Sequence, residues 1–140
     1  MAIALKRIYD KASRGDGTRV LVDRLWPRGI SKETARLDVW LKNVAPSDEL
    51  RRWFHSHPDQ WTEFRARYLE ELSSPAAQPA LEQLHGLAAR GHLTLLFASK
   101  RTELNNASVL KELLEGMRKP PVSTGAQRGA VAARARRRPQ

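Results

Sequence analysis

Three short runs of apolar and β-branched residues have the pattern of β-strands. They cover residues 3–8 (IALKRI), 18–25 (TRVLVDRL) and 93–98 (LTLLFA). The loop between the first two contains the Gly and Asp residues typical of turns. The third run is apolar almost throughout, which is typical of a strand covered on both faces in a parallel sheet. The chain is therefore predicted to contain a small, largely parallel sheet of about three or more strands.

Helical spacing dominates the region between the second and third strands. Trp61, Phe64, Tyr68 and Leu72 recur at intervals of three and four residues and form one apolar stripe. Capping and terminating residues predict helices over about residues 31–41, 47–54, 58–72 and 79–90, and another that starts at Thr102 or Asn105. Strands and helices in this order predict a single three-layer α/β domain, with helices flanking the sheet.

Charge divides the chain into two parts. The whole chain has 25 basic and 15 acidic residues and a net charge of +10, but residues 118–140 hold seven basic residues and no acidic one. This segment also lacks aromatic residues, so it cannot bury enough surface to offset its ordering entropy. We expect an α/β domain over residues 1–117 and a disordered basic tail over residues 118–140. The tail either binds nucleic acid or anionic lipid, or it is an extension without a partner.

Composition and motifs exclude several classes of protein. The chain has no Cys, which excludes disulfides, a thiolate nucleophile and Cys-ligated metal centres. No apolar run approaches the roughly 20 residues that cross a bilayer, and the N-terminus has the pattern of a strand rather than of a signal peptide. We expect a cytoplasmic protein without membrane contact. Glycine-rich phosphate loops and serine nucleophile elbows are absent. Whether the protein binds a cofactor stays open, and so does its oligomeric state.

The segment RVLVDRLWPRG, residues 19–29, is the strongest candidate for chemistry. A strand that ends in Asp23, Arg24, Trp26 and Arg28 places polar side chains where α/β proteins bind ligands. The two arginines are able to fork onto a phosphate or carboxylate, and Asp23 either holds one of them or transfers a proton. The alternative is a structural ion pair that holds the loop. Trp26 forms either the wall of a pocket or a lid on the core.

Lys100 and Arg101 follow the third strand and reach the same sheet edge if the strands are parallel, and Asn105 and Asn106 come within a turn after them. One of Arg51 and Arg52 is able to join them as a further cation. We therefore expect a crevice between residues 23–29 and 100–106 that binds a small anionic, phosphorylated or nucleotide-like molecule, or a nucleic-acid backbone. Two alternatives stay open: an enzyme with Asp23 as general acid/base, and a nucleic-acid-binding accessory protein that acts through its basic tail.

Histidines and the other tryptophans have less specific patterns. His55 and His57 are two residues apart, but a stable metal site needs three or four ligands, so no metal site is expected. His85 and His92 are predicted to lie at the surface. Trp40, Trp53 and Trp61 are predicted to belong to the core, since tryptophans at helical spacing usually pack there.

Several segments together resemble the YeaO-like family, a bacterial and archaeal domain of unknown function. They include LKRIYD (5–10), residues 19–29, WLK (40–42), LRRWF (50–54), TLLFA (94–98) and NNA (105–107), and the resemblance covers residues 3 to about 115. It implies a compact α/β domain and no particular activity. Related sequences carry His where this chain has Ser56, and often again at Leu104. These departures weigh against histidine-based catalysis.

Overall fold

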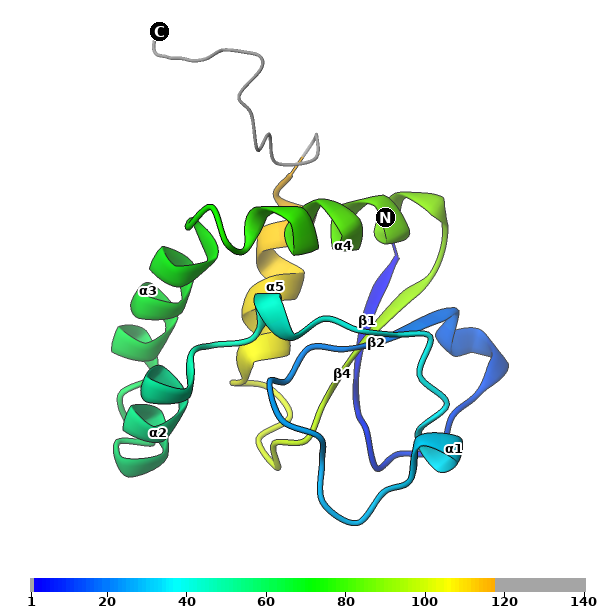
Figure 1. Cartoon of the computed structure of the whole chain (residues 1–140), viewed down its shortest axis with the longest axis horizontal. Helices are drawn as coiled ribbons and strands as arrows, with labels where there is room; N and C mark the ends of the chain where they lie inside the picture. Colours follow the sequence, from blue (N-terminus) through cyan, green and yellow to red (C-terminus); the bar gives the residue numbers. More distant parts are fainter. Residues whose placement is uncertain (1, 118–140) are drawn as a thin grey trace, which may run out of the picture.

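The computed structural model of the chain describes residues 2–117, and the predicted tail lies outside the described residues (Figure 1). Four strands form one fully parallel sheet in the order β1-β4-β2-β3. They are β1 (Ile3–Arg7), β2 (Thr18–Leu21), β3 (Val39–Trp40) and β4 (Leu93–Phe97). The central strand β4 is buried at every position, as its apolar run predicted. The expected small parallel α/β fold is confirmed.

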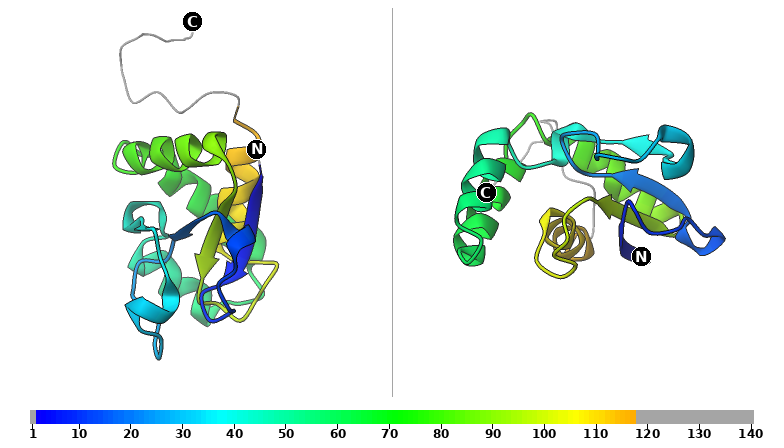
Figure 2. Two further views of the ribbon diagram at one scale, coloured as in Figure 1. Left: turned by 90° about the vertical axis from the view of Figure 1, so that its right-hand side faces the viewer. Right: turned by 90° about the horizontal axis from the view of Figure 1, so that it is seen from below.

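Helices cover the two faces of the sheet unequally. On one face, alternate strand residues such as Val20 and Leu95 share a core with the apolar sides of α3 (Trp61–Leu72), α4 (Gln78–Arg90) and α5 (Asn106–Glu115). The helix α2 (Asp48–Ser56) packs on α3. The other face is covered by the short helix α1 (Lys32–Ala35) and by loop residues that include Trp26. In Figure 2 the strands lie between α5 and α1, which gives three layers with a thin outer one.

The predicted helix over residues 31–41 is mostly wrong. Ser31 caps it as expected, because its hydroxyl accepts a hydrogen bond from the Thr34 N–H. The helix ends after one turn at Arg36, whose φ of 50° is left-handed. The chain then extends into the two-residue strand β3 beside β2, and a 3₁₀ turn, η2 (Lys42–Val44), follows. So short a strand leaves no period-2 pattern in the sequence.

Two other expectations need correction. The third helix starts at Trp61 rather than Pro58, because residues 58–59 form a turn. His85 was predicted to be exposed but is only 5% exposed within α4, and neither of its ring nitrogens has a hydrogen-bond partner among the described residues. Trp40, Trp53 and Trp61 do pack against the core, each with part of its surface exposed.

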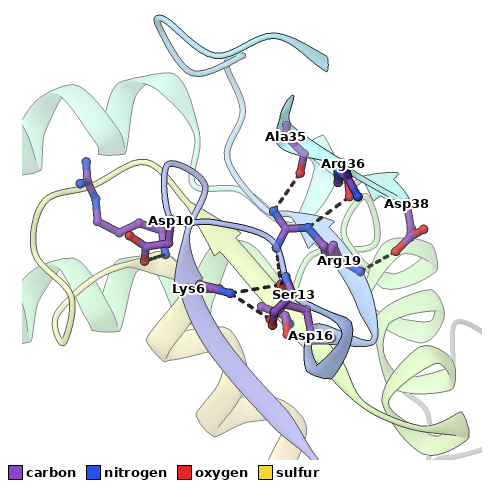
Figure 3. A network of polar contacts seen from close by, with 10 residues as sticks. Lys6, Asp10, Ser13, Asp16, Arg19, Ala35, Arg36 and Asp38 are labelled. Carbon is purple, nitrogen blue, oxygen red and sulfur yellow. Dashed lines mark hydrogen bonds and ion pairs between the residues drawn. The ribbon is translucent and has the colours of Figure 1, made fainter. Parts of the chain in front are cut away.

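A buried ion network ties the thin outer layer to the sheet (Figure 3). The Arg19 guanidinium donates to the Asp16 carboxylate at 2.6 Å and to the Ala35 carbonyl oxygen, at the end of α1, at 2.8 Å. Lys6 on β1 donates to the same carboxylate at 3.1 Å. Burial alone would raise the pKa of Asp16, but hydrogen bonds from Ser13, Lys6 and Arg19 hold that pKa well below its usual range. The network fixes α1 and the loop before β2 in place.

Gly17 joins that loop to β2 and is required there by two constraints. Its φ of 63° is left-handed, which favours glycine. A Cβ at this position would lie 2.4 Å from the His92 carbonyl oxygen at the start of β4. Close backbone approach therefore brings the beginnings of β2 and β4 together and sets their parallel register.

Candidate functional site

A cavity of about 740 Å³ lies beyond the carboxyl ends of β2 and β4. Its wall comes from three parts of the chain: the loop after β2, the loop after β4 up to the start of α5, and residues of α2 and α3. Figure 1 shows these loops side by side below the strands. Ligands of parallel α/β proteins bind at this edge, and the volume is that of an ordinary small-molecule site.

Asp23 is held in the cavity wall by hydrogen bonds to both of its carboxylate oxygens. Oδ2 accepts from the Ala98 N–H at 2.9 Å, and Oδ1 accepts from the Asn106 side-chain amide at 3.0 Å. Asn106 also donates to the Val22 carbonyl oxygen at 2.9 Å, which fixes its own orientation. Burial raises the pKa of Asp23, although the two hydrogen bonds and the charge of Arg51 partly oppose this shift.

Among residues 2–117, four cationic side chains line the cavity together with this carboxylate: Arg24, Arg51, Lys100 and Arg101. Arg24 donates to the carbonyl oxygens of Pro46 at 3.1 Å and Ala45 at 3.3 Å. Arg51 pairs with Asp48 at 3.0 Å. Arg101 donates to the Pro58 carbonyl oxygen at 2.7 Å and lies over the Phe54 ring. Lys100 is exposed. The cavity lining therefore carries an excess of positive charge.

Aromatic and aliphatic residues form the rest of the wall, including Trp26, Phe54 and Phe64. Trp26 packs edge-on against Trp40 with ring centroids 5.4 Å apart, and its indole N–H donates to the Ile30 carbonyl oxygen at 2.8 Å. The side chain thus covers the smaller core and borders the cavity at once. Phe64 is buried in the main core, and its ring also closes part of the cavity.

The sequence-predicted site residues divide into three groups. Asp23, Arg24, Trp26 and Lys100 line the cavity. Asn105 also borders it, but its carboxamide oxygen accepts from the Ser108 N–H at 2.9 Å and caps α5, so its main role is structural. Arg28 is not among the lining residues that the structure describes.

Arg28 is exposed because the loop turns where it lies. Pro27 before it is buried, and Gly29 after it has a left-handed φ of 75°. The Arg28 carbonyl oxygen accepts from the Tyr9 hydroxyl at 2.7 Å, which holds the turn against the β1 end of the sheet. The loop therefore directs Trp26, rather than Arg28, toward the cavity.

The sequence left open which of two adjacent arginines joins the site, and it placed Asn106 in the crevice segment without a role of its own. Arg51 lines the cavity, whereas Arg52 is largely exposed and pairs with Asp48. Asn106, the first residue of α5, holds Asp23, and the cap at Asn105 is the signal that places it there. Arg101 lines the cavity next to Lys100, at the sheet edge expected for both. Phe54 and Phe64 were missed as part of the wall, because only the tertiary packing of α2 and α3 brings them to this edge.

The two histidines considered as metal ligands, His55 and His57, have different surroundings in the structure. His55 borders the cavity, while His57 stacks on Trp53 with its Nδ1 2.9 Å from the Trp53 carbonyl oxygen. Within residues 2–117, no group of three or more His, Asp or Glu side chains is arranged to hold a metal ion. The helices of the same part of the chain are all too short or too polar to cross a membrane.

Comparison with known proteins identifies the family. A family model described as the inactive DUF488-N3 subclade matches residues 2–125. The uncharacterized protein YeaO of Escherichia coli K12 is 44% identical over 117 residues, which is 84% of this chain and 100% of YeaO. The uncharacterized proteins Rv3073c of Mycobacterium tuberculosis H37Rv and Mb3100c of Mycobacterium bovis are 43% identical over 114 residues, 81% of this chain and 94% of each relative. The chain therefore belongs to the YeaO-like family of DUF488-N3 domains. No solved structure matches it.

Proposed function

We propose that this protein is a binding domain for a small phosphorylated or nucleotide-like anion, which occupies the cavity beyond β2 and β4. The observation that carries the proposal is the lining: four cationic side chains and one carboxylate surround a cavity of about 740 Å³ at the carboxyl edge of a parallel sheet. An anion there would offset the mutual repulsion of the cations.

The cationic side chains differ in whether they already make hydrogen bonds or ion pairs within the protein. Arg24 and Arg101 already donate to backbone carbonyl oxygens, so their guanidinium groups are held in fixed positions beside the cavity. Lys100 is exposed and makes no ion pair with the acidic residues that the structure describes. A lysine in this state acts as a compact point charge for a phosphate. We assign Lys100 as the principal anion contact, and Arg28 plays no part.

Binding is favoured over catalysis by the contacts of Asp23. Both of its oxygens are engaged by the Ala98 N–H and the Asn106 amide, which hold the carboxylate in one position. The subclade to which the matching family model belongs is described as inactive. Both observations support Asp23 as a positioning and recognition group rather than a general acid/base.

Calorimetric titration with ribose 5-phosphate tests the proposal. The unmodified protein should bind this probe and gain melting temperature as the probe concentration rises, because the ligand stabilises only the folded state. Lys100→Ala should weaken binding by about tenfold, the effect of losing one charge-assisted contact of about 1.5 kcal/mol.

Arg90→Ala is the matched control. It removes one positive charge at the end of α4, next to the beginning of β4 and away from the cavity, so it should leave the affinity unchanged. Equal weakening by Lys100→Ala and Arg90→Ala would indicate attraction by net charge alone and would overturn the proposed site. Absence of binding to the unmodified protein would overturn the proposed function itself.

A further inference from the structure

Asp23 is out of place in a cavity that only attracts anions, because it repels them. Among the described residues, no Lys, Arg or His nitrogen lies within ion-pair distance of its carboxylate. An ionised carboxylate only accepts hydrogen bonds, and its two oxygens offer about four acceptor positions. Asp23 uses one position on each oxygen, toward Ala98 and Asn106. The other position on each oxygen has no partner among the described residues.

We propose that Asp23 receives a neutral edge with two adjacent N–H donors, as in the 2-amino-4-oxopyrimidine ring of guanine nucleotides and pterins, while the ligand's anionic group contacts Lys100. Two parallel N–H groups match two carboxylate oxygens in the same way as the fork of an arginine does. This inference rests on the proposed function and names the class of ligand for the same cavity.

The charges around Asp23 select a neutral donor edge over a cationic one. A guanidinium or amidine would present the same pair of donors, but Arg51, Lys100 and Arg101 line the same cavity and oppose a further positive charge. A neutral heterocycle satisfies the carboxylate without this repulsion. Its other end is then free to carry the negative charge that the cations attract.

The rest of the wall fits a planar ring. Trp26 borders the cavity, and heteroaromatic bases stack on such a side chain. Leu25 and Leu104 also line it, and they are unusually exposed for large apolar residues at 56% and 38%. A planar ligand would cover part of this apolar surface. Three features of the lining thus fit the same class of ligand: the two acceptor oxygens of Asp23, the cationic side chains and the apolar wall.

A comparison of GMP with ribose 5-phosphate tests the donor edge, because the two share the sugar phosphate and differ in the base. The unmodified protein should bind GMP at least about tenfold more tightly, the discrimination expected of a two-bond base contact. AMP and N1-methyl-GMP, which lack the two adjacent N–H donors, should lose most of this advantage. Pterin-6-carboxylate carries the same donor edge and a carboxylate in place of the sugar phosphate. Its affinity relative to GMP distinguishes a pterin from a guanine nucleotide as the ligand.

Asp23→Asn should abolish the advantage of GMP over ribose 5-phosphate, because an amide offers one donor and one acceptor instead of two acceptors. Asp38→Asn is the matched control: Asp38 also accepts a backbone N–H, from Arg19 at 2.8 Å, but lies outside the cavity lining. The methylated nucleotide makes the same test on the unmodified protein if Asp23→Asn does not fold.

The outcomes separate the two proposals. If ribose 5-phosphate binds through Lys100 and GMP binds no more tightly, the donor-edge inference is wrong and the anion site stands. An advantage of GMP that persists in Asp23→Asn, or with N1-methyl-GMP, also overturns the inference. If none of the phosphorylated probes binds, both proposals fail.

Discussion

The carboxylate of Asp16 lies between two cations and is shielded from water, so its charge supports the folded state. Its pKa in the folded protein lies well below the unfolded value of about 3.9. The ionised group therefore stabilises the fold at every pH above that unfolded value. This contribution is lost as the pH falls through the folded-state pKa, and unfolding free energies should decline as the solution is acidified below about pH 5.

Asp16→Asn should lower the free energy of unfolding at pH 7 by about 3–5 kcal/mol, because it leaves the buried Arg19 guanidinium without its anionic partner. Urea denaturation from pH 7 to pH 3 measures both effects, and the variant should lose much of the acid dependence. Asp48→Asn, which breaks two exposed ion pairs, is the control and should change little. A variant as stable as the control would show that the network of Figure 3 contributes nothing net.

At the scale of the secondary-structure element, α5 depends on its first residues. Asn105 caps the helix, and the next residue, Asn106, reaches Val22 and Asp23. Asn105→Ala should lower the free energy of unfolding by about 1 kcal/mol, the usual effect of losing a cap. It should also weaken ribose 5-phosphate binding indirectly, through movement of Asn106.

Asn105→Ser separates capping from ligand contact. Serine caps a helix nearly as well as asparagine, so stability and ribose 5-phosphate affinity, measured by urea denaturation and calorimetry, should stay close to those of the unmodified protein. Loss of affinity in a fully stable Asn105→Ser variant would instead assign Asn105 to the ligand.

Long elements were predictable from the sequence, and short ones were not. The buried run at residues 93–98 and the stripe from Trp61 to Leu72 each repeat a pattern over enough residues to identify strand and helix. The two-residue strand β3 has no such pattern, and it forms only because β2 offers a free edge. Arg28 and His85 were misplaced for a related reason: a turn directs one outward, and packing of neighbouring elements covers the other.

The candidate site was predictable as a location but only partly in its contacts. Parallel strands require Asp23 and Lys100 to meet at one sheet edge, and this follows from the sequence once the strands are recognised. Which side chain at the start of α5 faces Asp23 depends on the exact first residue of that helix, and the sequence left Thr102 and Asn105 as alternatives. The structure starts the helix at Asn106 and so makes Asn106 the partner of Asp23.

At the scale of the whole molecule, the sheet differs in stability from centre to edge. β4 is buried on both faces and bonded to β1 and β2, whereas α1 has a single turn and largely exposed side chains. Backbone amides of β4 should therefore exchange with solvent only on global unfolding, while those of α1 open locally. Native-state hydrogen exchange should show protection at least about 100-fold greater in β4, and equal protection would contradict this account.

The order β1-β4-β2-β3 also governs when the chain is able to fold. β1 and β2 are both complete by Leu21, but they do not pair with each other, and each meets its central neighbour only in residues 93–97. On the ribosome, a growing chain therefore has no strand partner for β1, and only the two-residue β3 for β2, until most of the domain has been synthesised. Contacts of such long sequence separation slow folding and lengthen the time for which apolar segments are open to aggregation.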